Sequence, residues 1–334
     1  MNNGHRNGQA IDFGLSSDFC PFPFLRNPHL QTLLGHWWKG KFAPLAYREC
    51  QVALADGDRL LLYDSVPSAW QPGKPMALVV HGLGGSHLSG PVQRLAGLLL
   101  PHGIRVVRID LRGSGGGASL ARKIYNGGCS GDIRMALAEM HCWDPTAPLI
   151  LAGFSLGGNI ALKLAGEAAE LPVPGLKFVA AVAPPIDLER CAGLLSEKRN
   201  RFYEFHFVRA LVKQVRAQER NFPDLPPASF PRRLTMRQFD DIYTAPRGGF
   251  TGADDYYRRS GALPLVPHIT IPTYVVTARD DPFVAVEPFE ALHQHSHMTV
   301  HISAHGGHLG FLGRDGAGGV RWAERRLADW IVQR

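Results

Sequence analysis

The chain has 334 residues, 45% of them hydrophobic, and a formal net charge of +7 at pH 7, which suits one large α/β domain or two small ones with a substantial core. No stretch approaches the roughly 18 consecutive apolar residues of a membrane-spanning helix, and the first 18 residues lack the apolar centre of a secretory signal. The five cysteines are an odd number without paired spacing, which argues against a disulfide framework and favours reduced thiols in a cytoplasmic protein.

The predicted elements alternate along most of the chain. We expect residues 1–18 to be disordered and 19–42 to form an irregular N-terminal arm, in which Trp37 and Trp38 pack in the core; anchoring of the two tryptophans to lipid is the alternative. Asp56-Gly57, between two strand-like runs, predicts a hairpin. Further strands are predicted at 76–82, 104–110, 148–153, 176–184, 272–278 and 299–303, with helical patterns between most of them. This alternation implies one α/β domain over 19–334, with a mostly parallel sheet covered by helices on both faces.

Residues 187–268 interrupt the alternation. They are helical and proline-rich without a convincing core strand, so we expect a helical cap inserted after the sixth strand. Residues 189–260 hold 14 Lys/Arg against 9 Asp/Glu, and one predicted helix carries a basic stripe: Arg209, Lys213, Arg216 and Arg220. No nucleic-acid motif accompanies the charge, so we expect no nucleic-acid partner. A solvated face is the simplest interpretation of the stripe, and peripheral contact with anionic lipid is the alternative.

A Gly-x-Ser-x-Gly pattern connects a predicted strand to a predicted helix. Ser155 stands between Gly153 and Gly157, after the apolar run 148–152 and before the helix-forming run that starts near residue 159. A reversal this tight forces the serine into a strained conformation and leaves no room for side chains two positions away. One interpretation is a tight turn with a capping serine. The other is a nucleophile elbow, which presents the hydroxyl above the sheet.

A nucleophilic serine needs a base, usually a histidine held by a carboxylate. Downstream, two predicted strands end in Asp280-Asp281 and in a glycine-rich loop with His305 and His308. The carboxyl ends of parallel strands lie along one edge of a sheet, where ligands bind. We predict a triad of Ser155, His308 and Asp281, with Asp280 capping the turn and His305 serving a structural role.

An acyl-transfer site also needs donors for the oxyanion. The segment HGLGGS at 81–86 follows the strand 76–82, so the backbone N–H of Leu83 is placed to face the nucleophile. The N–H of Leu156, directly after the serine, is the second predicted donor. A simple glycine turn is the alternative interpretation of this segment.

Several segments together resemble the α/β-hydrolase superfamily: VVHGLGGS, RIDLRGSGG, YNGGCSGDI, LAGFSLGGNIALKL, ARDDPF and GGHLGF, in this order. NPHLQTLLG near the start and YNGGCSGDIRMAL resemble, more narrowly, the YheT-like esterase family. The resemblance covers residues 20–330 and implies a carboxylesterase, an acylglycerol lipase or a medium-chain acyl-ester synthase acting on short to medium fatty acyl groups. We therefore predict a serine ester hydrolase that forms an acyl-enzyme, with no cofactor. The alternatives are an acyltransferase that passes the acyl group to an alcohol and a catalytically silent binding protein.

Two further patterns are weaker. Residues 113–118 contain G-x-G-x-x-A, but the position and the following acidic residue do not fit a dinucleotide site. Five histidines gather near the C-terminal end of the chain: His293, His295, His297, His301 and His305. Their spacing does not match that of zinc ligands, so no metal is predicted.

Overall fold

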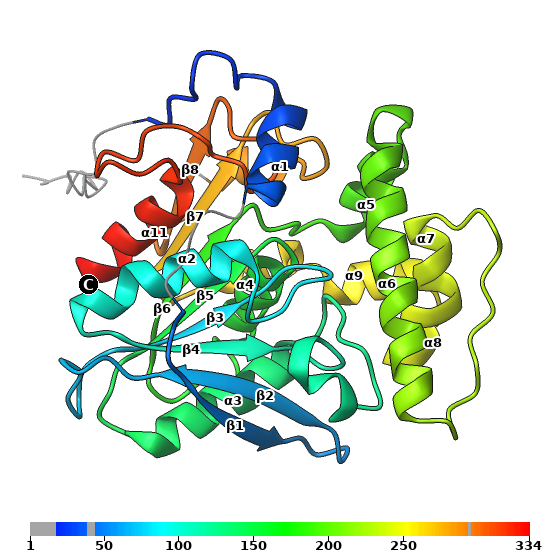
Figure 1. Ribbon diagram of the computed structural model, residues 1–334, viewed down its shortest axis with the longest axis horizontal. Coiled ribbons are helices and arrows are strands. Elements are labelled where there is room, and N and C mark those ends of the chain that lie inside the picture. Colours follow the sequence, from blue (N-terminus) through cyan, green and yellow to red (C-terminus); the bar gives the residue numbers. More distant parts are fainter. Residues whose placement is uncertain (1–17, 39–43, 293–294) are drawn as a thin grey trace, which may run out of the picture.

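The computed structural model describes residues 18–38, 44–292 and 295–334, so the predicted disorder of 1–18 falls, apart from residue 18, outside the described residues. In this part of the chain, eight strands form one sheet in the order β1-β2-β4-β3-β5-β6-β7-β8 (Figure 1). Their bounds are β1 Arg48–Ala53, β2 Arg59–Ser65, β3 Met76–Val80, β4 Arg105–Asp110, β5 Leu149–Phe154, β6 Leu176–Val182, β7 Thr273–Ala278 and β8 Met298–Ser303. The pairs β1–β2 and β2–β4 are antiparallel and the others parallel. The predicted hairpin and the mostly parallel sheet are confirmed.

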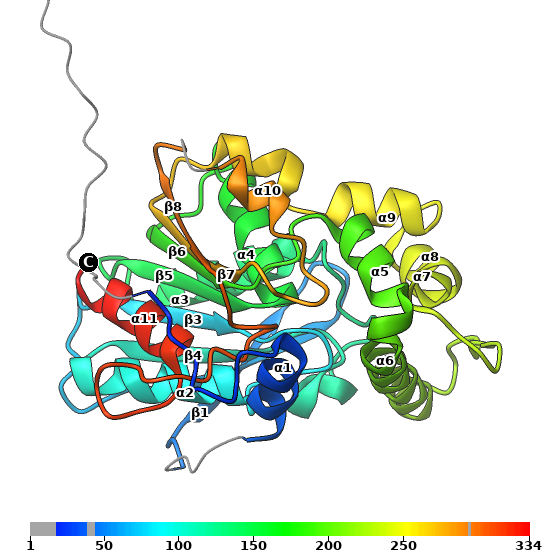
Figure 2. The same cartoon turned by 90° about the horizontal axis from the view of Figure 1, so that it is seen from above.

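Helices cover both faces of the sheet. The helices α2 (Gly90–Leu99) and α11 (Trp322–Val332) pack together on one face, whereas α3 (Ser130–Trp143), α4 (Leu156–Glu167) and the short α10 (Glu287–Glu290) belong to the core of the other face (Figure 2). This double cover explains why the central strands β3, β4, β5 and β7 are buried along their whole length. The sheet therefore holds its strand ends rigidly at one edge.

The segment between β6 and β7 contains only helices and loops among the described residues. Its elements are α5 Leu188–Ser196, a 3₁₀ turn Lys198–Asn200, α6 Arg201–Asn221, α7 Met236–Phe239, a π-helical turn Asp240–Thr244, α8 Ala245–Gly248, α9 Ala253–Ser260 and a 3₁₀ helix Leu263–His268. Most of them stand beside the sheet as a separate body in Figure 1. On α6, Val208, Leu211 and Val215 are buried while Arg209 and Lys213 are exposed, as the predicted amphipathic pattern requires.

One buried amide joins this cap to the helix that follows Ser155. The side-chain nitrogen of Asn159 donates to the carbonyl oxygens of Gly127 (3.0 Å) and Ser260 (2.9 Å). Its oxygen accepts from the N–H of Ala262 at 2.9 Å. Asn159 is fully buried, and these bonds use both of its amide N–H groups and one of the two lone pairs on its oxygen. The end of the cap is thereby fixed to the start of α4.

The N-terminal arm contains the helix α1 (Pro28–Trp37). Buried Gln31 donates to the carbonyls of Leu25 (2.7 Å) and Leu312 (3.1 Å) and accepts from the N–H of Leu312 (2.7 Å). The expectation that Trp37 and Trp38 lie in the core is wrong, because their exposed fractions are 61% and 52%. The buried positions of α1 are Gln31, Thr32 and Gly35, since this face of the helix packs on the backbone of the loop 307–310, while Leu33 is partly buried against the core.

Candidate active site

Ser155 occupies the sharp turn between β5 and α4. Its backbone has φ 51° and ψ −123°, a conformation that L-residues rarely adopt. A Cβ on Gly153 would overlap the carbonyl of Gly157, and a Cβ on Gly157 would overlap the carbonyl of His81. Both glycines are therefore required by close backbone approach, which is the geometry of a nucleophile elbow.

Three predicted residues meet at this turn. The Nε2 of His308 lies 2.9 Å from the Oγ of Ser155, and its Nδ1 lies 2.8 Å from the Oδ2 of Asp281. The side chain of His308 is 7% exposed and that of Asp281 is fully buried. An imidazole with a carboxylate on one nitrogen and a hydroxyl on the other is oriented to take the hydroxyl proton.

The Asp281 carboxylate is fixed by the loop that carries it. Its Oδ1 accepts hydrogen bonds from the backbone N–H groups of Phe283 (3.0 Å) and Val284 (2.9 Å). The ring of Phe283 lies 4.2 Å from the His308 ring, centroid to centroid. These contacts leave Oδ2 to the imidazole and restrict the rotation of the histidine ring.

The neighbouring aspartate has a different task. Asp280 accepts from the N–H of Gly307 at 2.9 Å, and its Oδ2 lies 3.3 Å from the Nδ1 of His305. Burial raises the pKa of Asp280 against the lowering effect of these two partners. The pair ties the end of β7 to the loop that holds His308, and it does not reach Ser155 through any hydrogen bond within the described residues.

The segment 81–86 contacts the nucleophile. A Cβ on Gly82 would stand 3.0 Å from the Cβ of Ser155, so this backbone passes directly over the serine. The Nδ1 of His81 lies 2.7 Å from the carbonyl oxygen of Gly82. His81 Nε2 accepts from the N–H of Leu111 at 3.3 Å, which leaves the proton on Nδ1, where it is donated to Gly82.

This contact sets the direction of the predicted oxyanion donor. Burial lowers the pKa of His81, so its ring is neutral and the Nδ1–H···O bond holds at neutral pH. In a trans peptide the C=O and the N–H point in opposite directions. Turning the Gly82 carbonyl toward His81 therefore turns the Leu83 N–H away from it. The Leu156 N–H stands at the first position of α4, where helix N–H groups lack intrahelical partners.

Sequence reasoning missed the residue that holds His308 from the other side. The backbone N–H of His308 donates to Thr32 Oγ1 at 2.9 Å, and that hydroxyl donates to the carbonyl of Pro28 at 2.8 Å. A Cβ on Gly307 would overlap the Pro28 carbonyl, so the histidine loop lies directly on α1. The only trace in the sequence is the segment NPHLQTLLG, whose polar and small residues form the contact face.

Two other segments serve packing. The N–H of Gly116, in the glycine-rich stretch, donates to the buried carboxylate of Asp110 at 2.8 Å, so this loop is folded onto a side chain of its own chain. His301 packs on Trp322 with ring centroids 5.0 Å apart, His305 faces Asp280, and the rings of His295 and His297 lie 6.4 Å apart. His293 lies outside the described residues.

The model of the α/β hydrolase fold family matches residues 77–315. The chain belongs to this family. It is 31% identical over 332 residues to the Escherichia coli (strain K12) protein named "Putative esterase YheT", across 97% of this chain and 95% of that one, which makes it a YheT-like hydrolase. It is 26% identical to the monoacylglycerol lipase of Saccharomyces cerevisiae, across 77% of this chain and 59% of the lipase. The solved esterase Pf2001 of Pyrococcus furiosus shares the fold, with a TM-score of 0.58 and 13% identity over 88% and 95% of the two chains.

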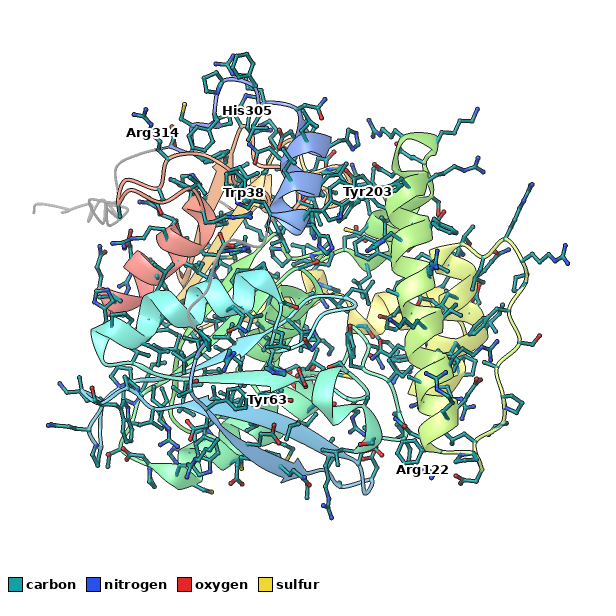
Figure 3. All side chains as sticks on the ribbon, in the orientation of Figure 1. Trp38, Tyr63, Arg122, Tyr203, His305 and Arg314 are labelled. Carbon is teal, nitrogen blue, oxygen red and sulfur yellow. The ribbon has the colours of Figure 1, made fainter. Side chains whose placement is uncertain are left out.

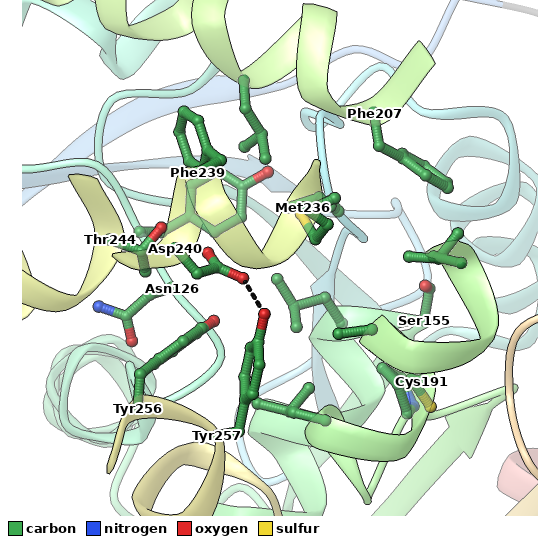
Figure 4. Close-up of a pocket in the computed structure, with 18 of the residues that line it drawn as sticks. Asn126, Ser155, Cys191, Phe207, Met236, Phe239, Asp240, Thr244, Tyr256 and Tyr257 are labelled. Carbon is green, nitrogen blue, oxygen red and sulfur yellow. Dashed lines mark hydrogen bonds between the residues drawn. The ribbon is translucent and has the colours of Figure 1, made fainter. Parts of the chain in front are cut away.

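In this hydrolase, Ser155 and His308 line two cavities at once. The inner cavity, about 110 Å³, lies under the cap (Figure 4). Near Ser155 its walls are mostly apolar and come from the loop after β3, from the start of α4, and from cap helices: Leu83, Leu156, Leu188, Ala192, Phe207 and Leu211. This cavity is shaped for an apolar group next to the serine.

The outer cavity, about 540 Å³, opens on the other side of Ser155. It lies between α1, the segment 82–92 and the first turns of α6. Tyr203 of α6 stacks on His29 of the arm, with its hydroxyl 3.1 Å from the histidine Nδ1, and stands between the two helices in Figure 3. Trp37, Leu88 and Phe202 line this cavity and are more than half exposed, so they surround its mouth.

Proposed function

We propose that this protein is a carboxylic ester hydrolase in which Ser155 attacks the ester carbonyl. His308 accepts the serine proton, and Asp281 orients the imidazole and stabilises its charged form. The observation that carries the proposal is the continuous hydrogen-bonded chain from the Ser155 hydroxyl through His308 to the buried Asp281 carboxylate. The names of the relatives, an esterase and a monoacylglycerol lipase, agree with ester cleavage.

The proposed reaction has two halves. The hydroxyl oxygen of Ser155 bonds to the carbonyl carbon while the N–H groups of Leu83 and Leu156 donate to the developing oxyanion. His308 then gives its proton to the leaving alcohol, and the acyl group stays on Ser155. Water enters, His308 takes its proton, and collapse of the second tetrahedral intermediate releases the acid and restores the Ser155 hydroxyl.

The two cavities suggest where the acyl and alcohol parts of the ester bind. We assign the acyl group, of short to medium length, to the inner cavity, because apolar side chains line it beside the serine. We assign the alcohol to the outer cavity, which is larger and opens to solvent past Trp37, Leu88 and Phe202. The product alcohol then leaves without passing the acyl chain.

A covalent probe tests the nucleophile. A fluorophosphonate should label the purified protein, Ser155→Ala should abolish the labelling, and Ser86→Ala, in the outer cavity, should leave it intact. On p-nitrophenyl esters of graded chain length, Ser155→Ala should lower kcat by about 10⁶, as in other serine hydrolases. Labelling that survives Ser155→Ala, or no labelling at all, would refute the proposal and support a catalytically silent binding protein.

Transfer to an alcohol is the second candidate activity. The acyl-enzyme is the same, and the outer cavity would hold the accepting alcohol where the leaving alcohol stood. Adding ethanol to the assay decides between them: ethyl ester as the main product at low ethanol concentration supports a transferase, whereas free acid supports a hydrolase.

Peripheral contact with anionic lipid is proposed from the cap. Arg209, Lys213 and Arg220 are exposed on α6, whereas Arg216 pairs with Glu219 at 2.8 Å. No described helix is both long and apolar enough to cross a bilayer. Sedimentation with liposomes that does not change with phosphatidylglycerol content would exclude this contact. All five cysteines are unpaired, which fits the proposed cytoplasmic location.

A further inference from the structure

The inner cavity is not apolar throughout. Asp240, Thr244, Asn126, Tyr256 and Tyr257 also line it, and Figure 4 shows them at the end away from Ser155. The Tyr257 hydroxyl donates to the Oδ2 of Asp240 at 2.7 Å, and the rings of Tyr256 and Tyr257 lie 5.3 Å apart. A cavity that starts as an apolar acyl site therefore ends on a carboxylate and several hydrogen-bonding groups.

The Asp240 carboxylate lacks a charged partner. Its residue is 6% exposed, and within residues 18–38, 44–292 and 295–334 no ion pair reaches it. Arg247 lines the same cavity, but its guanidinium donates to the carbonyl of Pro226 and lies over the Tyr243 ring. Burial raises the pKa of Asp240 to about 6 against the lowering effect of hydrogen bonds from Thr244 and Tyr257, so Asp240 is mostly ionised at neutral pH. A buried charge without a cation is unfavourable unless donors surround it.

The local backbone brings this group into the cavity. Residues Asp240–Thr244 form a π-helical turn, a conformation found in well under 1% of residues and often at functional sites. Three of its five residues, Asp240, Tyr243 and Thr244, line the cavity. An ordinary α-helical turn at this point would distribute these side chains differently around the axis.

We propose that the far end of the inner cavity binds a hydrogen-bond donor on the acyl group of the substrate, a hydroxyl or a protonated amine remote from the ester, with Asp240 as the acceptor. This inference rests on the proposed ester cleavage at Ser155 and specifies its substrate class. A fully aliphatic chain that reached this end would remove water from the carboxylate and offer no replacement. A site built to hydrogen-bond a substrate group rejects the analogue that lacks it.

The test compares esters that differ only at the far end of the acyl chain. Ethyl esters of graded length would carry a terminal methyl, hydroxyl or amino group, and kcat/KM would be measured with a pH-stat. The ratio of kcat/KM for the hydroxyl ester to that for the methyl ester should reach at least about tenfold at one chain length. Because each ratio is taken within one protein sample, the fraction of active enzyme cancels.

Variants of Asp240 distinguish recognition of a substrate hydroxyl from recognition of a protonated amine. Asp240→Leu should bring both polar-to-methyl ratios to about one. Asp240→Asn, which keeps an acceptor oxygen but no charge, should lower the amino ratio more than the hydroxyl ratio. Asp241→Asn is the matched control, since Asp241 is exposed on the same turn and does not line the cavity. Ratios near one in the unaltered protein, or ratios that Asp240→Leu leaves unchanged, would show that Asp240 only ties α9 to the turn before α8.

A binding measurement keeps this inference separate from the proposed reaction. Ser155→Ala protein would be titrated calorimetrically with the hydroxyl and methyl esters at the selective chain length. At least about tenfold tighter binding of the hydroxyl ester, lost in the Ser155→Ala/Asp240→Leu double variant, supports the polar site even if no ester is cleaved. Equal binding of the two esters would overturn it.

Discussion

The rim of the sheet and the cap are built in different ways. At the rim, Ser155 and the His308 loop lie against backbone that admits no extra atom, and hydrogen bonds join the Ser155 hydroxyl to His308 and His308 to the Asp281 carboxylate. In the cap, helices meet through aromatic and aliphatic side chains around a cavity, and side-chain hydrogen bonds at Glu204 and Asp240 add to this packing. We therefore expect the rim to fix the reaction and the cap to set the substrate, because side-chain packing tolerates substitution where backbone contact does not.

The largest expected effect tests which of the two neighbouring aspartates at the rim holds the His308 imidazole. Asp281→Asn should lower kcat on p-nitrophenyl acetate by about 10⁴, since the amide no longer holds the imidazole in the required tautomer. Asp280→Asn, one position earlier, should change kcat by only a few-fold, because Asp280 contacts the loop backbone and His305. Equal losses in the two variants would mean that the roles of the two carboxylates have been assigned wrongly.

In the cap, a buried charge makes stability depend on pH. Burial raises the pKa of Asp240 to about 6, from an ordinary value near 4, so the folded protein retains a proton that the unfolded chain releases. Its contribution to the free energy of unfolding should fall as pH rises from 4 to 6, by about 3 kcal/mol, and stay low above that. Asp240→Asn removes this dependence. Urea unfolding should show that the free energy of unfolding of the variant, relative to that of the parent protein, is higher at pH 7.5 than at pH 4.5. The same difference in free energy of unfolding at both pH values would contradict the raised pKa of Asp240.

A cap substitution should alter chain-length preference without altering the chemistry. Leu211 is 4% exposed and lines the inner cavity, so Leu211→Trp should obstruct it. The ratio of kcat/KM for p-nitrophenyl octanoate to that for the acetate should fall about 10- to 100-fold. Ile242→Trp, at an exposed cap position, serves as the control and should leave the ratio unchanged. A parallel loss on both esters would mean that the cap supports the rim directly.

The smallest expected effect tests whether α1 of the N-terminal arm holds His308 in position. Thr32→Val removes the acceptor for the His308 N–H and leaves that donor buried, which costs about 1–3 kcal/mol. We expect kcat to fall about tenfold with little change in KM, because His308 is displaced while substrate still binds. Thr32→Ser, which keeps the hydroxyl, should restore most of kcat. If the serine variant is as slow as the valine variant, Thr32 acts through packing alone.

The sequence pointed to residues that the structure brings together where local pattern and chemistry coincide. Ser155 and Asp281 each follow a strand that is buried along its length, His308 follows the partly buried strand β8, and a serine nucleophile requires a base and a carboxylate in reach. The Leu83 N–H was predicted as an oxyanion donor because a glycine-rich turn follows β3. The contribution of Thr32 did not emerge, because the bond from His308 joins positions 276 residues apart and a threonine in a helix has no special pattern. Asp240 was missed for the same reason: its cavity exists only once the cap has folded.

By itself, the amino-acid sequence determined the order of strands and helices, the cap as an insertion and the three residues at the strand ends. Each of these depends on residues near one another in the chain, through periodicity, glycine turns or strand termination. Only the tertiary structure decided that α1 supports the histidine loop, that His81 directs the Leu83 amide, and that the Asp240 carboxylate lines the inner cavity. The hydrogen bonds involved, from His308 to Thr32, from Leu111 to His81 and from Tyr257 to Asp240, join residues 276, 30 and 17 positions apart and leave no periodic trace in the chain.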